Sequence, residues 1–364
     1  MSHDPTLSLP WPGPSRTEPP ALSFFEFWPA ALFYLPILAQ AAGLALRYRS
    51  ATLLTAANPA ITAGGLCGES KAEILDQVAG RARALIAPYV LLAPGATLPA
   101  AEAAMEAAGL TYPLVAKPDI GCNGAGVRRI ADPAALARYL AGFPADAAVL
   151  LQQLVTAPGE AGIFYIRHPD DAVGRITSIT LKSSPVVTGD GRSTLRQLIL
   201  ADPRAGRIAQ LYLPRLAAQA DTVPAQGTQV PLVFVGNHCR GSIFRDGTDH
   251  ATPALTAAIE RLARALPRFH FGRFDVRFDT LAALTRGEGL QVIEINGAGA
   301  EATHVWDPRT RLWDAWRAQF FHYAAAWRIG AANRAAGARP TGMRALWQLW
   351  RRQTRLMAAY PESD

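Results

Sequence analysis

Polar side chains alternate with apolar ones in two neighbouring segments late in the chain. In FGRFDVRFD (271–279), a strand would place the aromatic side chains on one face and three charged ones on the other, namely Arg273, Asp275 and Arg277. In LQVIEIN (290–296), the same rule puts Glu294 and Asn296 together. A short connection predicts that the two strands pair, so that Asp275 faces Glu294 and Asn296.

Two carboxylates and an amide oxygen at one point indicate a site for a hard cation. Facing carboxylates repel one another unless a cation or a proton lies between them, and oxygen ligands suit Mg²⁺. We expect ATP with one or two Mg²⁺ ions, with Mn²⁺ as a substitute. A solvated polar face, on which Arg273 and Arg277 simply pair with the acids, is the other interpretation.

A lysine and a glycine-rich loop form a second candidate site in YPLVAKPDIGCNGAGV (112–127). Lys117 ends an apolar strand and needs an anionic partner, because an unpaired buried ammonium is costly. Glycines at 121, 124 and 126 would let backbone N–H groups approach an anion closely. The spacing is neither GxxxxGK[ST] nor a good GxGxxG, so a simple flexible loop stays open.

A helix is predicted over 71–86, where Ser70 and Glu73 form a capping-box pattern. Lys71 lies in its first turn, where a cation opposes the helix dipole unless it serves a ligand. Solvation of Lys71 at the surface is the alternative. Helices at 100–110 and 133–139 and strands in PLVAKP and VLLQQLV follow, and strands dominate 162–187.

The order of these segments resembles the ATP-grasp superfamily, most of all D-alanine–D-alanine ligases and related carboxylate-amine ligases. The resemblance covers residues 65–330, and GRFDVRF with VIEIN is its most specific part. It implies an α+β fold in which two α+β subdomains clasp ATP, with the nucleotide lid at about 110–190. The GDGRST turn (189–194) also looks like a stretch of cyanophycin synthetases.

The resemblance also implies a role for each candidate residue. The phosphates would be bound by Lys71, Lys117, Gly121, Gly124 and Gly126. The adenine edge and the ribose would be bound by Gln153, Leu154, Val155 and Glu160. The metal ligands would be Asp275, Glu294 and Asn296, and phosphoryl transfer would be assisted by Lys182 and Arg273.

The sequence departs from the ligase pattern in three places. Gln153 stands where the ligases have a glutamate, which affects nucleotide choice, although ATP is expected over GTP. The run GAGAEATH (297–304) lacks the serine-containing loop that supports D-alanine as substrate. Only residues 1–64 precede the matched region, so the substrate site must be built differently. Candidates for it are Arg192, Asn237, His238, Arg240, Glu301 and His304, although histidines of this kind are commonly structural.

Composition indicates a folded protein, because half of the 364 residues are hydrophobic and 18% are charged. Cys67, Cys122 and Cys239 lie far apart, which predicts neither a disulfide framework nor a zinc site and suits the cytoplasm. The net charge of +7 suits nucleic acid, an anionic membrane or phosphorylated molecules. No basic run interleaved with aromatics lies near the glycine loops, so nucleic acid is not expected.

The two ends of the chain suggest contact with a membrane. Residues 1–22 carry six prolines and predict an extended arm, and residues 23–50 hold an apolar helix. Interfacial docking, burial in the core and a true span all stay open for that helix, since Pro29 and Pro36 disfavour a simple span. A basic amphipathic helix in 331–364 fits either an anionic membrane at the inner face of the cell membrane or packing on the domain.

The expected function is an ATP- and Mg²⁺-dependent, ADP-forming ligase. It would activate a carboxylate as an acyl phosphate and join it to an amine or a similar nucleophile, so its partners would be small molecules. The alternatives are a phosphotransferase that uses the same site and an inactive scaffold, which the set of metal-ligand candidates disfavours. The identity of both substrates and the oligomeric state stay open.

Overall fold

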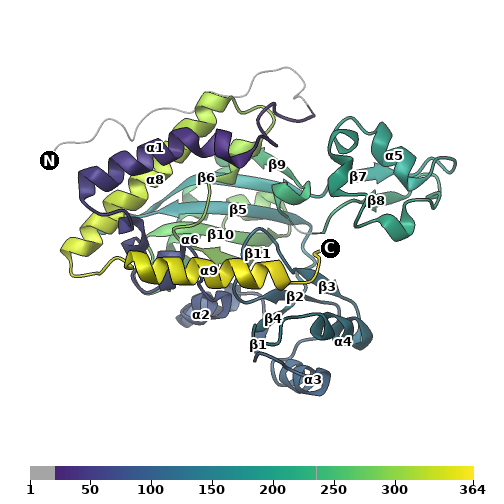
Figure 1. The fold of residues 1–364 in the computed structure, drawn as a ribbon, viewed down its shortest axis with the longest axis horizontal. Helices are drawn as coiled ribbons and strands as arrows, with labels where there is room; N and C mark the ends of the chain where they lie inside the picture. The colour runs from purple at the N-terminus through teal and green to yellow at the C-terminus, as the bar shows by residue number, and fades with distance from the viewer. Residues whose placement is uncertain (1–20, 235) are drawn as a thin grey trace.

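The computed structural model describes residues 21–234 and 236–364, so the predicted arm at 1–22 lies almost wholly outside the described residues. The predicted α+β class is confirmed, because antiparallel sheets and helices alternate along the chain (Figure 1). The strands are β1 (Tyr89–Leu92), β2 (Leu114–Pro118), β3 (Arg128–Ile130), β4 (Val149–Gln153), β5 (Gly159–Ile166), β6 (Arg175–Ser183), β7 (Val186–Thr188), β8 (Gln229–Pro231), β9 (Ile243–Asp246), β10 (Phe271–Phe278) and β11 (Leu290–Asn296). The helices are α1 (Ala30–Tyr48), α2 (Lys71–Asp76), α3 (Leu98–Ala107), α4 (Pro133–Ala141), α5 (Leu195–Ala201), α6 (Pro253–Arg264), α7 (Leu281–Thr285), α8 (Leu312–Ala335) and α9 (Met343–Ala359).

A five-stranded sheet with the order β11-β10-β5-β6-β9 forms the centre of the molecule. Strand alternation divides it into two faces. One face packs Ile163, Tyr165 and Val276 against α2 and α6 in the largest hydrophobic cluster. The other face buries Phe164 and Phe271 beneath α8 at one end and carries charged side chains at the other. Those charged side chains form the candidate site.

A smaller four-stranded sheet, with the order β1-β4-β2-β3, forms a second layer with α3 and α4 on it. Strands β5 and β6 lie within the range predicted for the lid, about 110–190, but pair with β10 and β9 in the large sheet. The two-stranded β7–β8 sheet forms a small unit with α5, which lies between the two strands in the chain, and this unit projects to one side (Figure 1). Within the predicted lid range, only β2 to β4 belong to the smaller layer, which β1 completes, and its role as a lid stays a prediction.

The predicted helix over 71–86 is shorter than its apolar spacing suggested. Helix α2 ends at Asp76, and a separate 3-10 turn covers Gly80–Leu85. Gly80 has a φ of 62°, a backbone conformation that ends a right-handed helix. The capping pattern itself is confirmed, because the Ser70 side chain accepts a hydrogen bond from the Glu73 N–H at 3.0 Å.

The segment between α1 and α2 is anchored to the central sheet by a buried asparagine. Asn58 donates to the Phe271 carbonyl at 2.7 Å and accepts from the Phe271 N–H at 3.0 Å. The following turn lies against the loop after β11, where a Cβ on Gly65 would lie 2.7 Å from the Gly297 Cα. Only a residue without a side chain fits there, so the N-terminal segment forms a wall of the site.

Three helices from the two ends of the chain cover the side of the molecule that holds the site (Figure 1). Helix α1 lies along α8, and Phe33 and Ile37 are its buried residues. Among the described residues, α1 is the single helix that is long and apolar enough, by length and composition, to cross a membrane. Helix α8 runs through the predicted boundary at 331, and the basic helix of 331–364 is α9.

Candidate active site

The predicted strand pair brings its acidic residues face to face. Asp275 pairs directly with Glu294 across β10 and β11, and Arg273 pairs with Asn296. A bulge follows Asp275 and locally increases the twist of the strands. Directly opposed residues on one face have their Cβ atoms about 5 Å apart. The carboxylates of Asp275 and Glu294 and the Asn296 amide therefore share one patch, as the alternation indicated.

Cations surround the carboxylate of Asp275. Arg273 donates from Nε to Oδ1 at 2.7 Å and from a terminal nitrogen to Oδ2 at 3.0 Å. Lys182 Nζ lies 3.3 Å from Oδ2. Burial acts to raise the pKa of Asp275, but Arg273 and Lys182 outweigh it and hold that pKa below its usual value. Asp275 is therefore an anion that already binds the two predicted catalytic cations.

Glu160 extends this network of charged side chains along the central sheet to Arg277. Its carboxylate lies 3.3 Å from Lys182 Nζ and accepts a hydrogen bond from Arg277 at 3.0 Å. All three side chains come from adjacent strands, because Glu160 pairs with Lys182 on one side and with Arg277 on the other. Two cations therefore bind the Glu160 carboxylate. Its role in binding the ribose stays a prediction.

Lys117 is the buried lysine that the sequence indicated. It is 7% exposed, and its Nζ donates to the Gln152 side chain at 2.9 Å and to the Ile293 carbonyl at 2.8 Å. Burial lowers its pKa to about 8, although Glu294 acts in the opposite direction. An ammonium has three protons to donate. The bonds to Gln152 and Ile293 use two of them, so one proton remains for a ligand.

The glycine loop after Lys117 lies beside Lys71. The Lys71 ammonium donates to the Gly121 carbonyl and lies 3.7 Å from Glu294. Asn123, Gly124 and Gly126 all have positive φ, so the loop makes a tight series of turns. Lys71 therefore points into the site rather than into solvent, and it links the loop to the metal-ligand candidates.

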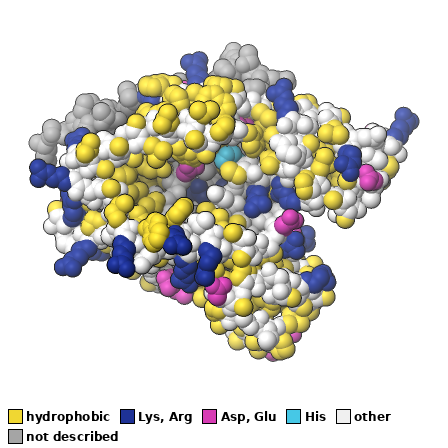
Figure 2. Space-filling view, viewed as in Figure 1, with side chains coloured by type: hydrophobic (Ala, Val, Ile, Leu, Met, Phe, Trp, Pro, Cys, Tyr) yellow, Lys and Arg dark blue, Asp and Glu magenta, His cyan; other side chains and the backbone are white. Residues whose placement is uncertain are grey.

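A cavity of about 590 Å³ lies between the two layers and collects most of the predicted residues. Figure 2 shows the molecule hollowed on this side. The predicted residues that line it are Lys71, Lys117, Gly121, Gly124, Gln153, Leu154, Val155, Glu160, Lys182, Arg273, Asp275, Glu294 and Asn296. Gly126 lies in the same loop but is absent from the cavity wall.

Gln153 lies at the cavity wall, but its side chain is committed elsewhere. Its amide accepts from the Thr111 N–H at 3.0 Å and donates to the Thr111 and Pro113 carbonyls at 3.2 and 3.4 Å. It thus ties the end of β4 to the loop before β2. The neighbouring Gln152, which the sequence did not single out, orients Lys117 instead. Recognition of an adenine edge by the Gln153 side chain stays a prediction.

Two further carboxylates line the cavity, those of Glu69 and Glu301. Tyr34 of α1 donates a hydrogen bond to the Glu301 carboxylate, and Arg273 donates to the Glu301 carbonyl at 3.1 Å. Burial raises the pKa of Glu301 and that of Glu69. Glu69 Oε2 is buried and has no hydrogen-bond partner among the described residues. Tyr34 and Glu69 were missed, because neither belongs to a recognisable motif.

The other substrate-site candidates divide into two groups. Asn237 and His238 line the cavity, and His238 stacks on Trp306 with ring centroids 4.5 Å apart. Burial lowers the His238 pKa to about 4, so the ring is neutral at neutral pH. Arg192, Arg240 and His304 are absent from the cavity wall. Arg192 belongs to the GDGRST turn, which Asp190 closes by accepting from the N–H groups of residues 192 and 193.

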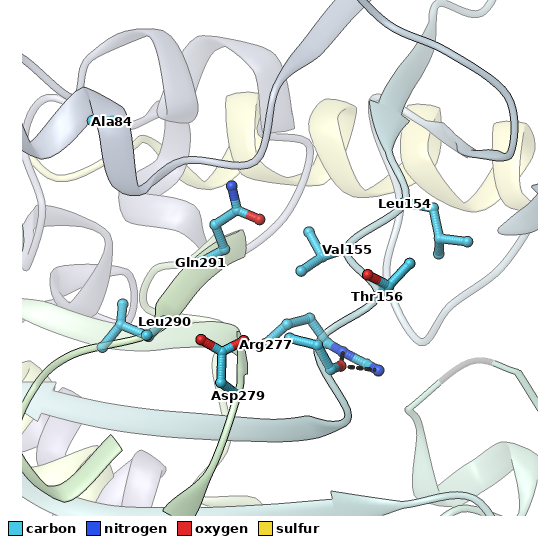
Figure 3. A pocket seen from close by; sticks show the side chains of 10 residues that line it. Ala84, Leu154, Val155, Thr156, Arg277, Asp279, Leu290 and Gln291 are labelled. Atoms are coloured by element: carbon cyan, nitrogen blue, oxygen red, sulfur yellow. Dashed lines mark hydrogen bonds between the residues drawn. The ribbon is translucent and has the colours of Figure 1, made fainter. Parts of the chain in front are cut away.

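A second cavity of about 480 Å³ lies beside the linker that follows β4 (Figure 3). Arg277 lines both cavities, as do Leu154 and Val155. Its guanidinium donates twice to the Ala157 carbonyl, at 2.6 and 3.0 Å, and reaches Glu160 on the other side. Arg277 therefore fixes the linker between the two layers rather than simply neutralising a solvated acid.

The C-terminal segment holds the glycine loop in place. Tyr360 donates to the Ile120 carbonyl at 2.7 Å, and its ring stacks on Phe143 with centroids 5.1 Å apart. Ser363 accepts from the Gly126 N–H at 3.0 Å and donates to the Gly124 carbonyl at 2.7 Å. These contacts join the end of the chain to the loop that carries the predicted phosphate-binding N–H groups.

Replacing Tyr360 should loosen this loop. Tyr360→Ala removes an aromatic stack and a hydrogen bond that together contribute about 1–3 kcal/mol, so amide exchange over 120–127 should become roughly 10- to 100-fold faster. Hydrogen–deuterium exchange with mass spectrometry measures this change. Tyr360→Phe keeps the stack and should show a smaller increase. Equal exchange in wild type and Tyr360→Ala would mean that the segment does not restrain the loop.

The donor set suits a divalent cation. Two carboxylates and the Asn296 amide oxygen supply hard oxygens. The Asn296 Nδ2 group is buried without a hydrogen-bond partner among the described residues, so it is available to donate to an oxygen of a bound ligand. No group of three or more His, Cys, Asp or Glu side chains in the described part of the chain could hold a metal ion. A cation here would therefore need Asn296 and oxygens from a ligand, which matches how Mg²⁺ is bound with nucleotide phosphates.

No protein-family model matches the sequence, and no curated protein matches it. Among solved structures, the chain is similar to a bifunctional glutathione synthetase from Pasteurella multocida, with 17% identity, a TM-score of 0.34 and 69% of this chain covered. It spans 35% of that protein's length. For D-cycloserine synthetase DcsG the identity is 18%, the TM-score 0.36, and the coverage 74% of this chain and 69% of that one.

For the D-alanine–D-alanine ligase from Bacillus anthracis, the identity is 15%, the TM-score 0.40, and the coverage 74% of this chain and 68% of that one. All three similarities combine low sequence identity with TM-scores below 0.5. Values this low do not assign an activity, so the roles of the residues depend on the geometry of the site.

Proposed function

We propose that this protein is an ATP-grasp enzyme that uses ATP and Mg²⁺ to activate a carboxylate as an acyl phosphate and joins it to an amine. The observation that supports this most strongly is the convergence of Asp275, Glu294 and Asn296 with Lys117 on one cavity between two layers. Anionic ligands for a cation and cationic ligands for phosphates then lie side by side, which is the arrangement that a metal–nucleotide complex requires.

In the proposed reaction, a carboxylate oxygen of the acid forms a bond to the γ-phosphorus of ATP, and the bond to ADP breaks. Lys182 and Arg273 both lie at the Asp275 carboxylate. We propose that these two cations hold the charge on the phosphoryl group that is transferred beside it. Asp275, Glu294 and Asn296 would hold Mg²⁺, which supplies charge neutralisation of the phosphates. Lys71 and Lys117 would bind phosphate oxygens at the glycine loop.

The amine then forms a bond to the acyl carbon, and phosphate leaves. A protonated amine must first lose a proton. Neutral His238, with its lowered pKa, is a weak base, whereas Glu69 and Glu301 are carboxylates whose pKa values burial raises. We propose that these two glutamates, which both line the cavity, hold the ammonium and accept its proton.

Product analysis tests the function. The full-length protein, incubated with Mg²⁺ and ATP and pools of amino acids, peptides and polyamines, should release ADP and phosphate with at least one acid. Hydroxylamine added to that acid should give a hydroxamate, because it intercepts the acyl phosphate. ADP release with a stable phosphorylated product and no hydroxamate would instead identify a phosphotransferase, the second function that this site could support. No nucleotide turnover with any pool would contradict both.

Nucleotide affinity should depend on the protonation of Lys117. Because burial lowers its pKa to about 8, Lys117 is an ammonium below that pH and neutral above it. The affinity for ATP should therefore be constant below about pH 8 and fall up to about tenfold per pH unit above it. Titration calorimetry over this range measures the change. Lys117→Arg, which stays charged, should flatten the profile, and an unchanged slope in that variant would contradict the assignment.

A further inference from the structure

Helix α1 presents an apolar face that nothing in the described structure covers. Leu32, Leu35, Leu38 and Leu46 are 57–81% exposed, and no charged side chain occurs between Ala30 and Leu46. Single exposed leucines are common on protein surfaces, but a continuous apolar face along a whole helix marks an interaction site.

The opposite side of α1 is fixed to the protein. Tyr34 donates to Glu301, Gln40 donates to the Phe320 carbonyl at 2.8 Å, and the Phe33 carbonyl accepts from Trp316 at 3.0 Å. Phe33 is buried among Phe25 and Trp306. A spanning helix would have to break these contacts and remove a wall of the cavity, so the geometry favours a helix that lies along a surface.

Helix α9 presents a second outward face with a different composition. Met343, Trp347 and Trp350 are more than half exposed at helical spacing, and the neighbouring Arg344, Arg351 and Arg352 are exposed as well. The Arg351 guanidinium lies 4.7 Å from the centre of the Trp347 ring. Tryptophan and arginine together suit the boundary between headgroups and hydrocarbon, where the ring is half buried and the cation meets anionic lipid.

The two faces lie on the same side of the molecule and frame the cavity. Figure 2 shows hydrophobic side chains gathered over α1 and, across a hollow, hydrophobic and basic side chains over α9. Ala30 and Tyr34 of α1 and Gln353 of α9 line the cavity between them. A flat partner that touched both helices would therefore lie across the mouth of the candidate active site.

We propose that this side of the protein, formed by the outer faces of α1 and α9, docks on the surface of an anionic lipid bilayer. Helix α1 inserts its leucines among the acyl chains, while the arginines of α9 bind acidic headgroups. The cavity mouth then faces the headgroup layer. Charge complementarity selects lipid as the occupant, because an apolar helix beside an arginine–tryptophan helix matches both layers of an anionic interface. The docking does not depend on the chemistry proposed above.

Vesicle flotation of the full-length protein tests the docking. Vesicles of phosphatidylcholine mixed with phosphatidylglycerol should bind the protein, and vesicles of phosphatidylcholine alone should bind it far more weakly. The triple variant R344Q/R351Q/R352Q should lose on the order of 100-fold in affinity for the acidic vesicles, since each arginine contributes about fivefold. The matched control R81Q/R261Q/R268Q loses the same charge from exposed positions on the α6 side and should bind as the wild type does.

Leu35→Asp with Leu38→Asp changes only exposed positions and should abolish binding while circular dichroism and the melting temperature stay close to wild type. If both arginine variants lose the same affinity for acidic vesicles, the effect is one of net charge alone, and the proposal is overturned. Sedimentation velocity without vesicles tests the remaining alternative, which is that this face binds a second copy of the chain. A dimer that the leucine variant dissociates would assign the face to a second copy of the chain, and a wild type that ignores acidic vesicles would also exclude lipid.

Discussion

Replacing Glu294 by alanine should abolish Mg²⁺-dependent formation of ADP while the protein stays folded. Glu294 faces Asp275 across the strand pair and lies 3.7 Å from Lys71. Without it, the proposed cation loses one of two carboxylates at the point where phosphate charge must be neutralised, so turnover should fall by roughly 10³-fold or more. A coupled assay for ADP measures the rate, and circular dichroism reports the fold.

Glu288→Ala is the matched control for this experiment. Glu288 lies just before the same strand, is exposed and pairs with Arg286 at 2.9 Å, and it does not line the candidate site. Its loss removes the same charge and should leave turnover within about twofold of wild type, as surface substitutions usually do. If Glu294→Ala turns over at the wild-type rate, Glu294 is not a ligand of the proposed metal ion.

Arg273→Gln should have the second-largest effect, and it should act on turnover more than on nucleotide binding. Arg273 binds both oxygens of Asp275 and donates to the Glu301 carbonyl, so its guanidinium lies between the metal-ligand patch and the substrate end. A cation that stabilises charge in the transition state contributes about 10²–10³-fold to the rate. Nucleotide affinity, which other cations support, should change by less than about tenfold.

Arg277→Gln separates this role from a general loss of charge. Arg277 lies two residues along the same strand face but binds Glu160 and the Ala157 carbonyl beside the linker. Its loss should weaken nucleotide binding through the linker and leave the maximal rate nearly unchanged. If the two arginine variants show the same pattern of KM and kcat, Arg273 has no special role in phosphoryl transfer.

The sequence predicted that Asp275, Glu294 and Asn296 share one face of a strand pair because strand geometry is local, and their role as metal ligands stays a prediction. Alternation fixes which side chains share a face, and a short connection makes neighbouring strands pair, so Asp275, Glu294 and Asn296 could be placed together. Burial of Lys117 was predicted from its apolar strand, but its hydrogen-bond partners are the neutral oxygens of Gln152 and Ile293 rather than an anion. The α+β class was what the resemblance of the segment order to ATP-grasp enzymes implied.

The rest of the site depends on contacts between segments that are distant in sequence. Tyr34 and Glu69 enter the cavity through the packing of α1 on α8 and the fit of the Gly65 turn against the loop after β11. The clamp on the glycine loop by Tyr360 and Ser363 joins residues more than 200 positions apart. Neither periodicity nor spacing indicates such contacts. The 71–86 helix was overextended because its apolar spacing continued through Gly80, where the backbone turns.

The boundaries of the predicted lid show the same limit. Strands β5 and β6 follow the lid strands directly, yet they pair with β10 and β9, which come about 60–110 residues later in the chain. Local pattern identifies the strands but not the sheet to which they belong. Gln152 and Gln153 make the point for side chains, since alternation puts them on opposite faces and only the packing shows that Gln152 orients Lys117.

Binding of Mn²⁺, used in place of Mg²⁺, tests the central claim most directly. Electron paramagnetic resonance measures free Mn²⁺ in the presence of the full-length protein, with and without a non-hydrolysable ATP analogue. The wild type should bind Mn²⁺ tightly only with the nucleotide analogue, and the Asp275→Asn and Glu294→Ala variants should lose that binding while Glu288→Ala keeps it. Tight nucleotide-dependent Mn²⁺ binding that survives both site substitutions would contradict the account.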